Sequence, residues 1–380
     1  MASTPVFFEN SLAFARPKPK TILMTADTLG GVWTFSLELA RALGQQGVEV
    51  ALATMGAPLS QEQCEAVREI PTLEVYESSF KLEWMRDPWK EIDLAGTWLL
   101  ELEENIQPDV VHLNFYSHAA LPWHAPTVVV GHSCILSWWL AVRGEPAPGM
   151  WYTYRQRVMR GLHAADTVIA PTRAMATALN QHYGPLDVKM IPYGRDTDFF
   201  SPGKKEQFVL AIGRVWDEGK NIAALEHVAP QLAWPVYVAG EQRHPDGGRA
   251  ETENVCYLGP LPVRQLADYL GRAFIYALPA RYEPFGLSVL EAGLSGCALV
   301  LGDIPSLREN WQDAAIFVQP NDTEALRDAI EDLISDDDRR EALGVCARAR
   351  AIQFTPARMA AAYVAIYSDL MAANNLMVKN

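Results

Sequence analysis

The chain has 380 residues, of which 49% are hydrophobic and 21% are charged. This balance is typical of globular proteins, and at roughly 150 residues per domain the length predicts two or three domains. The formal net charge of −14 argues against a nucleic-acid-binding protein, because such a protein needs a basic surface to neutralise phosphates.

Short apolar runs alternate with helical patterns along the first half of the chain, as in parallel sheets whose faces are covered by helices. The predicted strands of this half are residues 21–27, 48–54, 73–77, 109–115, 127–131, 167–170 and 188–192. The predicted helices include residues 32–46, 91–107, 150–165 and 173–183. These elements predict one α/β unit with its own parallel sheet.

The second half of the chain shows the same alternation. Its predicted strands are residues 208–213, 236–239, 255–258, 274–278, 298–301 and 315–318. Its predicted helices are residues 222–232, 263–271, 286–294, 323–335 and 339–353. Between the halves, residues 193–205 carry glycine and proline and no helical period, which predicts a linker. A last helix over residues 356–373 follows the second unit, so the sequence predicts an α/β protein with two sheets.

Two glutamates flank a predicted helix start in the segment 278–291, which reads Leu-Pro-Ala-Arg-Tyr-Glu-Pro-Phe-Gly-Leu-Ser-Val-Leu-Glu. A strand ends at Leu278 and a helix begins near Gly286, so the free N–H groups and positive dipole end of that helix would face an anion beyond the sheet edge. Glu283 precedes the helix and Glu291 lies in its second turn, so both would reach hydroxyl groups around a bound diphosphate. The alternative is a helix-capping acid plus an unrelated surface glutamate.

Two cations, Arg214 and Lys220, lie in a loop between a predicted strand and a predicted helix. Two cations beyond one sheet edge suit a diphosphate, because arginine supplies a planar fork of donors and lysine a point charge. The alternative is a loop that is merely solvated.

Two further segments end strands of the first half. In residues 26–32 a strand runs into paired glycines and then a helix, which is a phosphate-type turn in form. The segment lacks Gly-x-Gly-x-x-Gly and Gly-x-x-x-x-Gly-Lys-Ser/Thr, which argues against a dinucleotide or P-loop site. His132 stands just beyond another strand, where it would hydrogen-bond a sugar hydroxyl or shield a positive transition state. The alternative is a structural histidine.

No metal site is predicted. His112, His118 and His124 are spaced too far apart for a helical zinc pair. The acidic run of residues 336–338 lies between two predicted helices, as a solvated junction would.

The segment 134–151 follows His132 and combines Trp138, Trp139 and Trp151 with a Gly/Pro-rich stretch. One interpretation is an aromatic-walled pocket or lid, and another is ordinary core packing. A third is a peripheral membrane patch, helped by arginines on the next helix at positions 155, 157 and 160. The net charge of −14 disfavours binding to anionic lipid.

The cysteines and the N-terminal region predict a cytoplasmic protein. The five cysteines form no Cys-x-x-Cys pair, which favours free thiols in a reducing compartment. The first apolar stretch is broken by Glu9 and Asn10, which argues against a secretory signal. No run of about 18 apolar residues predicts a membrane span.

Taken together, these segments resemble the retaining glycosyltransferases of family four, which have the GT-B architecture. The resemblance covers nearly the whole chain and is strongest over residues 208–322. The Glu-x₇-Glu of the segment 278–291, the Gly-Arg…Lys-Asn loop, and a later tail Pro-x₈-Ala-Ala-x₂-Val-x-Pro over 305–320 are specific in combination. Residues 191–196 are similar to the family's interdomain Pro-Asn-Gly-Val-Asp, with Tyr193 and Arg195 in place of the usual residues.

The resemblance implies two Rossmann-like domains that face each other across a cleft. Residues 1–195 would form an acceptor-binding domain, completed by a C-terminal helix over 356–380 that crosses back to it. Residues 196–355 would form the nucleotide-sugar donor domain.

The resemblance also implies a role for each matched residue. The catalytic residues would be His132, which faces the transferred sugar, Glu283, which binds donor-sugar hydroxyls, and Arg214 and Lys220, which hold the diphosphate. Glu291 would hold the ribose. The other donor contacts would come from Gly31, Leu261 in the base-contacting turn 257–261, and the backbone of Phe285, Gly286 and Leu287. The acceptor side would include Trp33, Trp138 and Trp139.

The implied reaction moves a sugar from a UDP- or GDP-linked donor to a hydroxyl acceptor, with retention. The nucleoside diphosphate sugar is a co-substrate, and no metal or other cofactor is expected. The alternatives are a non-transferring nucleotide-sugar enzyme, such as an epimerase or hydrolase, and a catalytically silent nucleotide-sugar-binding protein. No nucleic-acid partner is expected, and the sequence predicts no particular oligomeric state.

Overall fold

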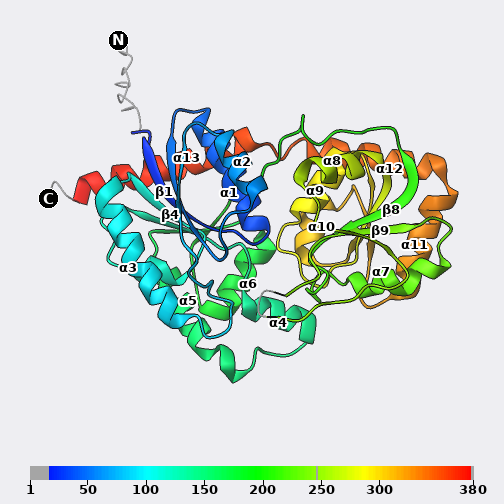
Figure 1. Ribbon diagram of the computed structural model, residues 1–380, viewed down its shortest axis with the longest axis horizontal. Helices are drawn as coiled ribbons and strands as arrows, with labels where there is room; N and C mark the ends of the chain where they lie inside the picture. The colour runs from blue at the N-terminus through cyan, green and yellow to red at the C-terminus, as the bar shows by residue number, and fades with distance from the viewer. Residues whose placement is uncertain (1–16, 245–246, 378–380) are drawn as a thin grey trace, which may run out of the picture.

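The computed structural model describes residues 17–244 and 247–377, and it contains two parallel sheets, one in each half of the chain (Figure 1). The first sheet has strand order β3-β2-β1-β4-β5-β6-β7, and the second has order β10-β9-β8-β11-β12-β13. Helices cover the sheets, and the central strands are almost wholly buried and apolar, as parallel sheets require. The predicted α/β class is confirmed.

The strands begin and end within a few residues of their predicted positions. Those of the first sheet are β1 (Thr21–Asp27), β2 (Glu49–Met55), β3 (Leu73–Glu77), β4 (Val110–Leu113), β5 (Thr127–Val130), β6 (Thr167–Ala170) and β7 (Val188–Met190). Those of the second sheet are β8 (Glu206–Ile212), β9 (Val236–Ala239), β10 (Cys256–Gly259), β11 (Ala273–Leu278), β12 (Ala298–Gly302) and β13 (Ile316–Val318).

Most helices also lie where the sequence predicts them. In the first unit these are α1 (Gly31–Gly44), α3 (Trp89–Ile106), α5 (Tyr152–Ala164) and α6 (Arg173–Tyr183). In the second unit they are α7 (Ile222–Val228), α8 (Val263–Arg272), α9 (Leu287–Leu294), α11 (Thr323–Ser335) and α12 (Asp337–Ala351), followed by α13 (Pro356–Met377). The predicted helix 222–232 is shorter than expected: α7 ends at Val228, and residues 229–231 form a 3-10 turn that contains a proline.

Three helices lie in segments for which no helix was predicted: α2 (Gln61–Arg68), α4 (Ile135–Arg143) and α10 (Pro305–Trp311). Each has a local start signal. A capping box between Ser60 and Gln63 begins α2, and a proline occupies the first turn of α10. In α4, the Cys134 side chain accepts the Ser137 N–H, and Gly144 ends the helix in the left-handed conformation. The tryptophan-rich segment is therefore partly helical.

The strand order places two loops at the switch points of the sheets. In each sheet the chain first moves outward to one side and then returns to the other side of its first strand, β1 or β8. The loops that follow β1 and β8 thus diverge from those that follow β4 and β11, and ligands of open parallel sheets bind at such positions. The glycine turn follows β1, and the Arg214–Lys220 loop follows β8.

The chain crosses between the two units twice, side by side. The linker passes so close to the start of α13 that a Cβ atom on Gly194 would lie 2.4 Å from the Thr355 carbonyl carbon. The Arg195 N–H donates to the Phe354 carbonyl at 3.0 Å. From this crossing α13 runs back along the first unit, where it packs against α1 and β4 (Figure 1). Within the described part of the chain, no helix has the length and apolar character to cross a membrane.

Candidate active site

The carboxyl edges of the two sheets face each other, and the glycine turn of one meets the cationic loop of the other. A Cβ atom on Gly30 would lie 3.4 Å from Arg214 Nη1, and one on Gly31 would lie 3.6 Å from Leu287 Cδ1. Both glycines are exposed. Gly30 has a φ of 102°, which favours glycine. Residues from both units, at the two switch points, therefore border the same region.

The loop that carries Arg214 and Lys220 is held rigidly at the sheet edge. The Arg281 and Tyr282 N–H groups donate to the Gly219 carbonyl at 2.8 and 3.1 Å. Asn221 begins α7 in the left-handed conformation, and its Nδ2 donates to the Pro279 and Pro320 carbonyls at 2.9 and 2.7 Å. These bonds tie the loop to the ends of β11 and β13.

Each of the two cations has a carboxylate partner. Arg214 Nη2 donates to Asp217 Oδ2 at 2.8 Å, and Lys220 forms a half-buried ion pair with Glu283. Burial opposes the charged form of Asp217, but Arg214 and Lys220 outweigh it and hold the pKa of this carboxyl below its usual value. The predicted catalytic residues Arg214, Lys220 and Glu283 thus lie together.

Glu283 folds back over the start of α9. Its Oε1 accepts the Gly286 N–H at 3.0 Å and the Phe285 N–H at 3.4 Å. Gly286, with a φ of 92°, precedes Leu287, the first residue of the helix. A carboxylate in this place is favoured by the positive end of the helix dipole. Two of the three backbone groups predicted to bind the donor therefore donate to Glu283 here.

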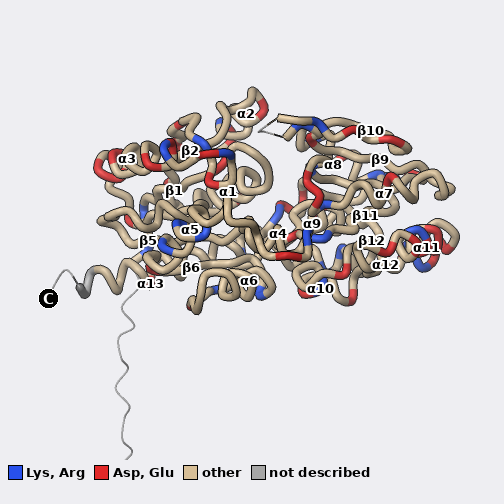
Figure 2. The backbone as a smooth tube through the Cα atoms, turned by 90° about the horizontal axis from the view of Figure 1, so that it is seen from below, with Lys and Arg blue, Asp and Glu red and all other residues tan. Residues whose placement is uncertain are grey.

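Glu291 lies in a buried ion-pair network that the sequence motif does not reveal. Its Oε1 accepts from Arg195 Nε at 2.7 Å, and Arg195 Nη1 lies 3.2 Å from Glu38 Oε1 of α1. Arg41 Nη1 also donates to Glu38 Oε1, at 2.7 Å. Burial raises the pKa of Glu291, although Arg195 opposes the shift. Arg195 therefore joins the linker, the first unit and the second unit. Figure 2 shows α1, which carries Glu38, and α9, which carries Glu291, on the two sides of the boundary between the units.

His132 follows β5 and has both ring nitrogens engaged. Its Nδ1 lies 2.5 Å from Tyr193 Oη, and its Nε2 lies 2.7 Å from Asn114 Oδ1. The Phe35 ring meets the imidazole edge-on at 4.8 Å. Burial, reinforced by the neighbouring His112, lowers the pKa of His132 to about 3. The imidazole is therefore neutral at physiological pH.

The tryptophans of α4 lie at the boundary between the units. Trp138 Nε1 donates to Asp217 Oδ1 at 2.9 Å, and Trp139 packs against Trp138 with 5.9 Å between ring centroids. Arg143 lies over both rings and pairs with Glu218 of the second unit at 2.6 Å. This α4 contact bridges the units. Trp33 is almost wholly buried in α1 and packs within the larger hydrophobic core.

The predicted base-contacting turn lies at the same edge of the second sheet. Tyr257 Oη donates to the Gly240 carbonyl at 2.8 Å, and the Gly240 N–H donates to the Gly259 carbonyl at 2.9 Å. Leu261, the last residue of this turn, is half-buried. A Cβ atom on Gly240 would lie only 1.9 Å from the Gly213 carbonyl oxygen, so Gly240, to which the turn is hydrogen-bonded, packs directly behind Arg214.

Asp27, at the end of β1, was not predicted as a site residue. Its side chain is buried, and its Oδ1 has no hydrogen-bond partner among the described residues. Burial raises the pKa of Asp27 to about 7, although Arg214 and a backbone hydrogen bond from Leu29 oppose the shift. Its position, a strand end directly before the glycine turn, is the signal by which the sequence could have identified it.

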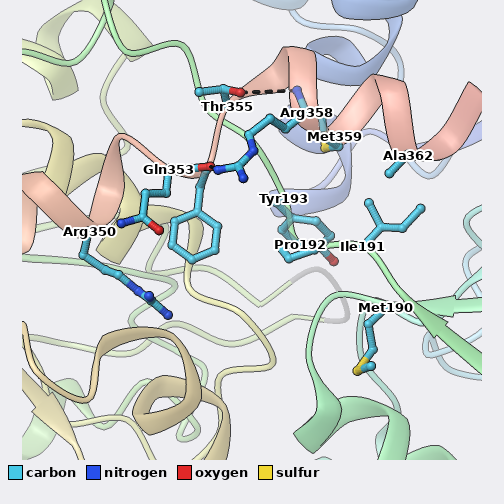
Figure 3. Close-up of a pocket in the computed structure, with 11 residues that line it drawn as sticks. Met190, Ile191, Pro192, Tyr193, Arg350, Gln353, Thr355, Arg358, Met359 and Ala362 are labelled. Carbon is cyan, nitrogen blue, oxygen red and sulfur yellow. Dashed lines mark hydrogen bonds between the residues drawn. The ribbon is translucent and has the colours of Figure 1, made fainter.

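A cavity of about 320 Å³ lies at the double crossing of the chain (Figure 3). It is lined by residues 190–193, where the chain leaves β7 and enters the linker, and by residues around the start of α13. It is largely apolar in its lining, with Arg350 and Arg358 at its border. Tyr193 belongs to this lining, and its hydroxyl reaches His132. The cavity therefore adjoins the candidate site through Tyr193, while the cations and Glu283 do not line it.

Two protein families match the chain in sequence. Residues 29–199 match Glycosyltransferase Family 4, and residues 194–350 match Glycosyl transferases group 1. A D-inositol 3-phosphate glycosyltransferase of Xylanimonas cellulosilytica is 28% identical over 90% of this chain and 92% of its own length. An alpha-maltose-1-phosphate synthase of Mycolicibacterium smegmatis is 27% identical over 67% of this chain and 76% of its own length.

Solved structures share the two-sheet fold. Sucrose-phosphate synthase from Thermosynechococcus elongatus matches with a TM-score of 0.79 and 18% identity, over 93% of this chain and 100% of that one. HepE from Anabaena, in complex with UDP and glucose, matches with a TM-score of 0.70 and 15% identity, over 92% of this chain and 100% of that one.

Proposed function

The chain belongs to the group 1 glycosyltransferases of family four and has the GT-B fold of that family, and we propose that this glycosyltransferase moves a sugar from a nucleoside diphosphate sugar to a hydroxyl acceptor with retention at the anomeric carbon. The observation that carries the proposal is the meeting of Arg214 and the Lys220–Glu283 pair with the Gly30–Gly31 turn of the facing unit.

The donor half of the reaction follows from the chemistry of these groups. Arg214, Lys220 and the N-terminus of α9 would bind the diphosphate, with Gly30 and Gly31 allowing close approach. Glu283 would bind hydroxyl groups of the sugar, and Glu291, whose Oε1 is held by Arg195, would offer its other oxygen to the ribose. The donor is UDP- or GDP-linked in this proposal. UDP is the nucleotide in the HepE structure.

Retention is proposed to occur on one face of the sugar. The bond between the anomeric carbon and the phosphate oxygen breaks, the acceptor oxygen bonds to the same face of that carbon, and the acceptor proton passes to the leaving phosphate. Arg214 and Lys220 would stabilise the charge that develops on the diphosphate. This route needs no proton transfer to His132. The imidazole of His132 is neutral and both of its nitrogens are hydrogen-bonded, which supports the route. Closure of the units would limit hydrolysis.

Two measurements test the proposal. A thermal-shift screen with UDP, GDP, ADP and their sugars identifies the nucleotide, because a ligand that binds only the folded state raises its melting temperature. With that donor, Glu283→Ala and Arg214→Ala should abolish transfer and leave the fold intact. Glu341→Ala and Arg264→Ala, at exposed positions outside the site, are the matched controls. Near-normal turnover in both site variants would refute the assignment.

The acceptor screen separates the remaining candidates. The names of two relatives point to a phosphorylated polyol or sugar, so inositol phosphates and glucose phosphates are the first hydroxyl compounds to test. Products analysed with and without acceptor distinguish transfer from epimerisation or hydrolysis, and donor binding without any turnover would indicate a catalytically silent binding protein. If the donor is consumed at the same rate with and without acceptor, the result would favour a hydrolase.

Metal independence and a cytoplasmic location complete the proposal. Arg214 and Lys220 supply positive charge at the diphosphate, so transfer should persist after dialysis against EDTA. A loss of transfer that Mg²⁺ restores would contradict this. All five cysteines are free, which supports a reducing compartment.

A further inference from the structure

A continuous chain of hydrogen bonds links the crossing helix to the linker through the candidate site. Tyr367 of α13 lies 2.5 Å from His112 Nδ1, and His112 Nε2 lies 3.2 Å from Asn114 Oδ1. The same Asn114 oxygen lies 2.7 Å from His132 Nε2, and His132 Nδ1 lies 2.5 Å from Tyr193 Oη. The centroid of the Tyr193 ring lies 4.6 Å from that of Phe285, which comes just before α9, so this chain of hydrogen bonds ends beside the donor site.

The orientation of the Asn114 amide is determined by its other partners. Its Nδ2 donates to the Thr25 carbonyl at 2.6 Å and to Ser36 Oγ at 3.2 Å, which uses both amide hydrogens. Its backbone N–H donates to Thr25 Oγ1 at 2.9 Å. The Asn114 oxygen must therefore face the two histidines, and an amide oxygen can only accept.

The direction of every bond in the chain follows from that oxygen. His112 and His132 must each donate through Nε2–H, because Asn114 Oδ1 has no hydrogen to offer. In a neutral imidazole the other nitrogen is then an acceptor. Each Nδ1 accordingly accepts a hydrogen bond from a tyrosine, Tyr367 for His112 and Tyr193 for His132.

The surroundings of His132 contain no carboxylate in contact with the imidazole among the described residues. The titratable groups that face it are Tyr193 from the linker and His112 from β4, with Phe35 of α1 packed on the ring. Tyr363 and Tyr367 of α13 face His112. Burial lowers the pKa values of His112 and His132 to about 3.

We propose that Asn114 is a positioning residue for the transfer reaction, which holds His132 as the neutral Nε2–H tautomer and directs its Nδ1 to the Tyr193 hydroxyl. His132 then serves as an uncharged wall of the sugar site, and its imidazole takes no part in proton transfer. Tyr193 couples this wall to the linker, so the positions of the linker and of His132 depend on each other. This inference rests on the proposed function, because it assigns His132 to the sugar site.

The tautomer can be measured without any substrate. In ¹⁵N-labelled protein, long-range ¹H–¹⁵N spectra distinguish Nδ1 from Nε2 protonation, and the variant His132→Gln assigns the His132 signals. We expect Nε2–H and no titration of His132 between pH 5.5 and 8. An Nδ1–H tautomer, or titration of His132 in that range, would overturn the proposal. A wild-type protein with the expected tautomer but no transferase activity would count against the proposed function alone.

Asn114→Asp tests the link to catalysis. A carboxylate at this place would favour imidazolium, so the ordinary histidine pKa of roughly 6.5 should return. Its rate relative to wild type should then fall about tenfold between pH 8 and pH 5.5, because about nine-tenths of a group with that pKa is protonated at the lower pH. The comparison with wild type at each pH cancels the titration of Asp27. A constant ratio across this range would overturn the proposal.

Two further variants separate positioning from folding. Asn180→Asp makes the same change on α6, outside the site, and should follow the wild-type pH profile. Tyr193→Phe removes the hydroxyl but leaves Asn114 in place, so the Nε2–H tautomer should persist while kcat falls equally at every pH. If His132 adopts the Nδ1–H tautomer in the Tyr193→Phe variant, then Tyr193 and not Asn114 sets the tautomer, which would contradict the proposal. This variant keeps the test open if Asn114→Asp does not fold.

Discussion

Trp138 of the first unit donates its indole N–H to Asp217 Oδ1 of the second unit at 2.9 Å, while the other Asp217 oxygen holds Arg214. A residue predicted for the acceptor side thus supports a cation of the donor side through one carboxylate. Asp217 also accepts the Gly219 N–H at 2.9 Å, so it fixes the loop from within.

Asp217→Asn should weaken donor binding. Arg214 loses its charged partner, and a hydrogen bond between charged groups is worth about 1.5 kcal/mol or more, so we expect KM for the donor to rise about tenfold. Steady-state kinetics with the identified donor measure the change. Asp328→Asn, which removes an exposed ion pair with Arg327, should leave KM unchanged. An unaltered KM in Asp217→Asn would show that this carboxylate does not support the diphosphate site.

Arg195→Met should destabilise the protein strongly. The change leaves Glu291 buried without its cation, which costs about 3–5 kcal/mol when one partner of a buried pair is removed. Urea unfolding measures the loss. Arg339→Met, which breaks the exposed pair with Asp332, should cost less than about 1 kcal/mol.

A second change tests the cause of that loss. In the double variant Arg195→Met, Glu291→Gln, the buried negative charge is gone, so much of the stability should return. If the double variant is less stable than Arg195→Met alone, the loss comes from packing and not from an unpaired charge.

Asp27→Asn should stabilise the protein at pH 8 and have little effect near pH 4. Burial raises the folded-state pKa of Asp27 to about 7, above the ordinary 3.8 of the unfolded chain. The folded protein therefore binds this proton more tightly than the unfolded chain does. The contribution of Asp27 to the free energy of unfolding of the wild type is fully present below pH 4 and is lost as the pH rises to 7. The amide removes this loss, a gain of up to about 4 kcal/mol at pH 8.

Thermal midpoints recorded from pH 4 to pH 8 check the sign for Asp27→Asn. The difference between the variant and wild type should grow with pH and level off above pH 7. Asp313→Asn, at an exposed position, provides the control and should show no trend. A difference that shrinks as pH rises would contradict the raised pKa.

Gly240→Ala should distort the donor site. Gly240 has a φ of 145°, and an added Cβ would lie 1.9 Å from the Gly213 carbonyl oxygen, just before Arg214. We expect a loss of at least about 1 kcal/mol in the free energy of unfolding, together with weaker nucleotide binding in calorimetry. At Gly149 an added Cβ meets nothing within 4 Å, so Gly149→Ala should preserve both quantities. Equal behaviour of the two variants would exclude a packing role for Gly240.

The elements that local patterns specify could be predicted from the sequence. Strand β11, the turn at Gly286 and helix α9 follow from an apolar run, a glycine and a helical period within about twenty residues. The positions of Arg214 and Glu283 at one sheet edge follow from the rule that parallel strands share their carboxyl ends. This local reasoning explains why the donor-side residues are found together.

The partners of these residues could not be predicted in the same way. Arg195 and Glu291 are separated by 96 positions, and His132 and Tyr193 by 61. No periodicity connects such residues, because their contacts arise only when the linker passes between the units. Arg195 and Tyr193 appeared in the sequence as departures from a family pattern, and only the fold shows that each binds a residue of the candidate site.

The return of α13 to the first unit has a consequence for biosynthesis. Tyr363 and Tyr367 are fully buried, and Tyr367 meets His112 across 255 positions of the chain. During translation the first unit emerges from the ribosome with this part of its core uncovered, and it stays so until α13 has been made. Contacts between such distant positions form slowly, and exposed apolar surface promotes aggregation. The nascent first unit is therefore expected to depend on chaperones until α13 has been synthesised and packs against it.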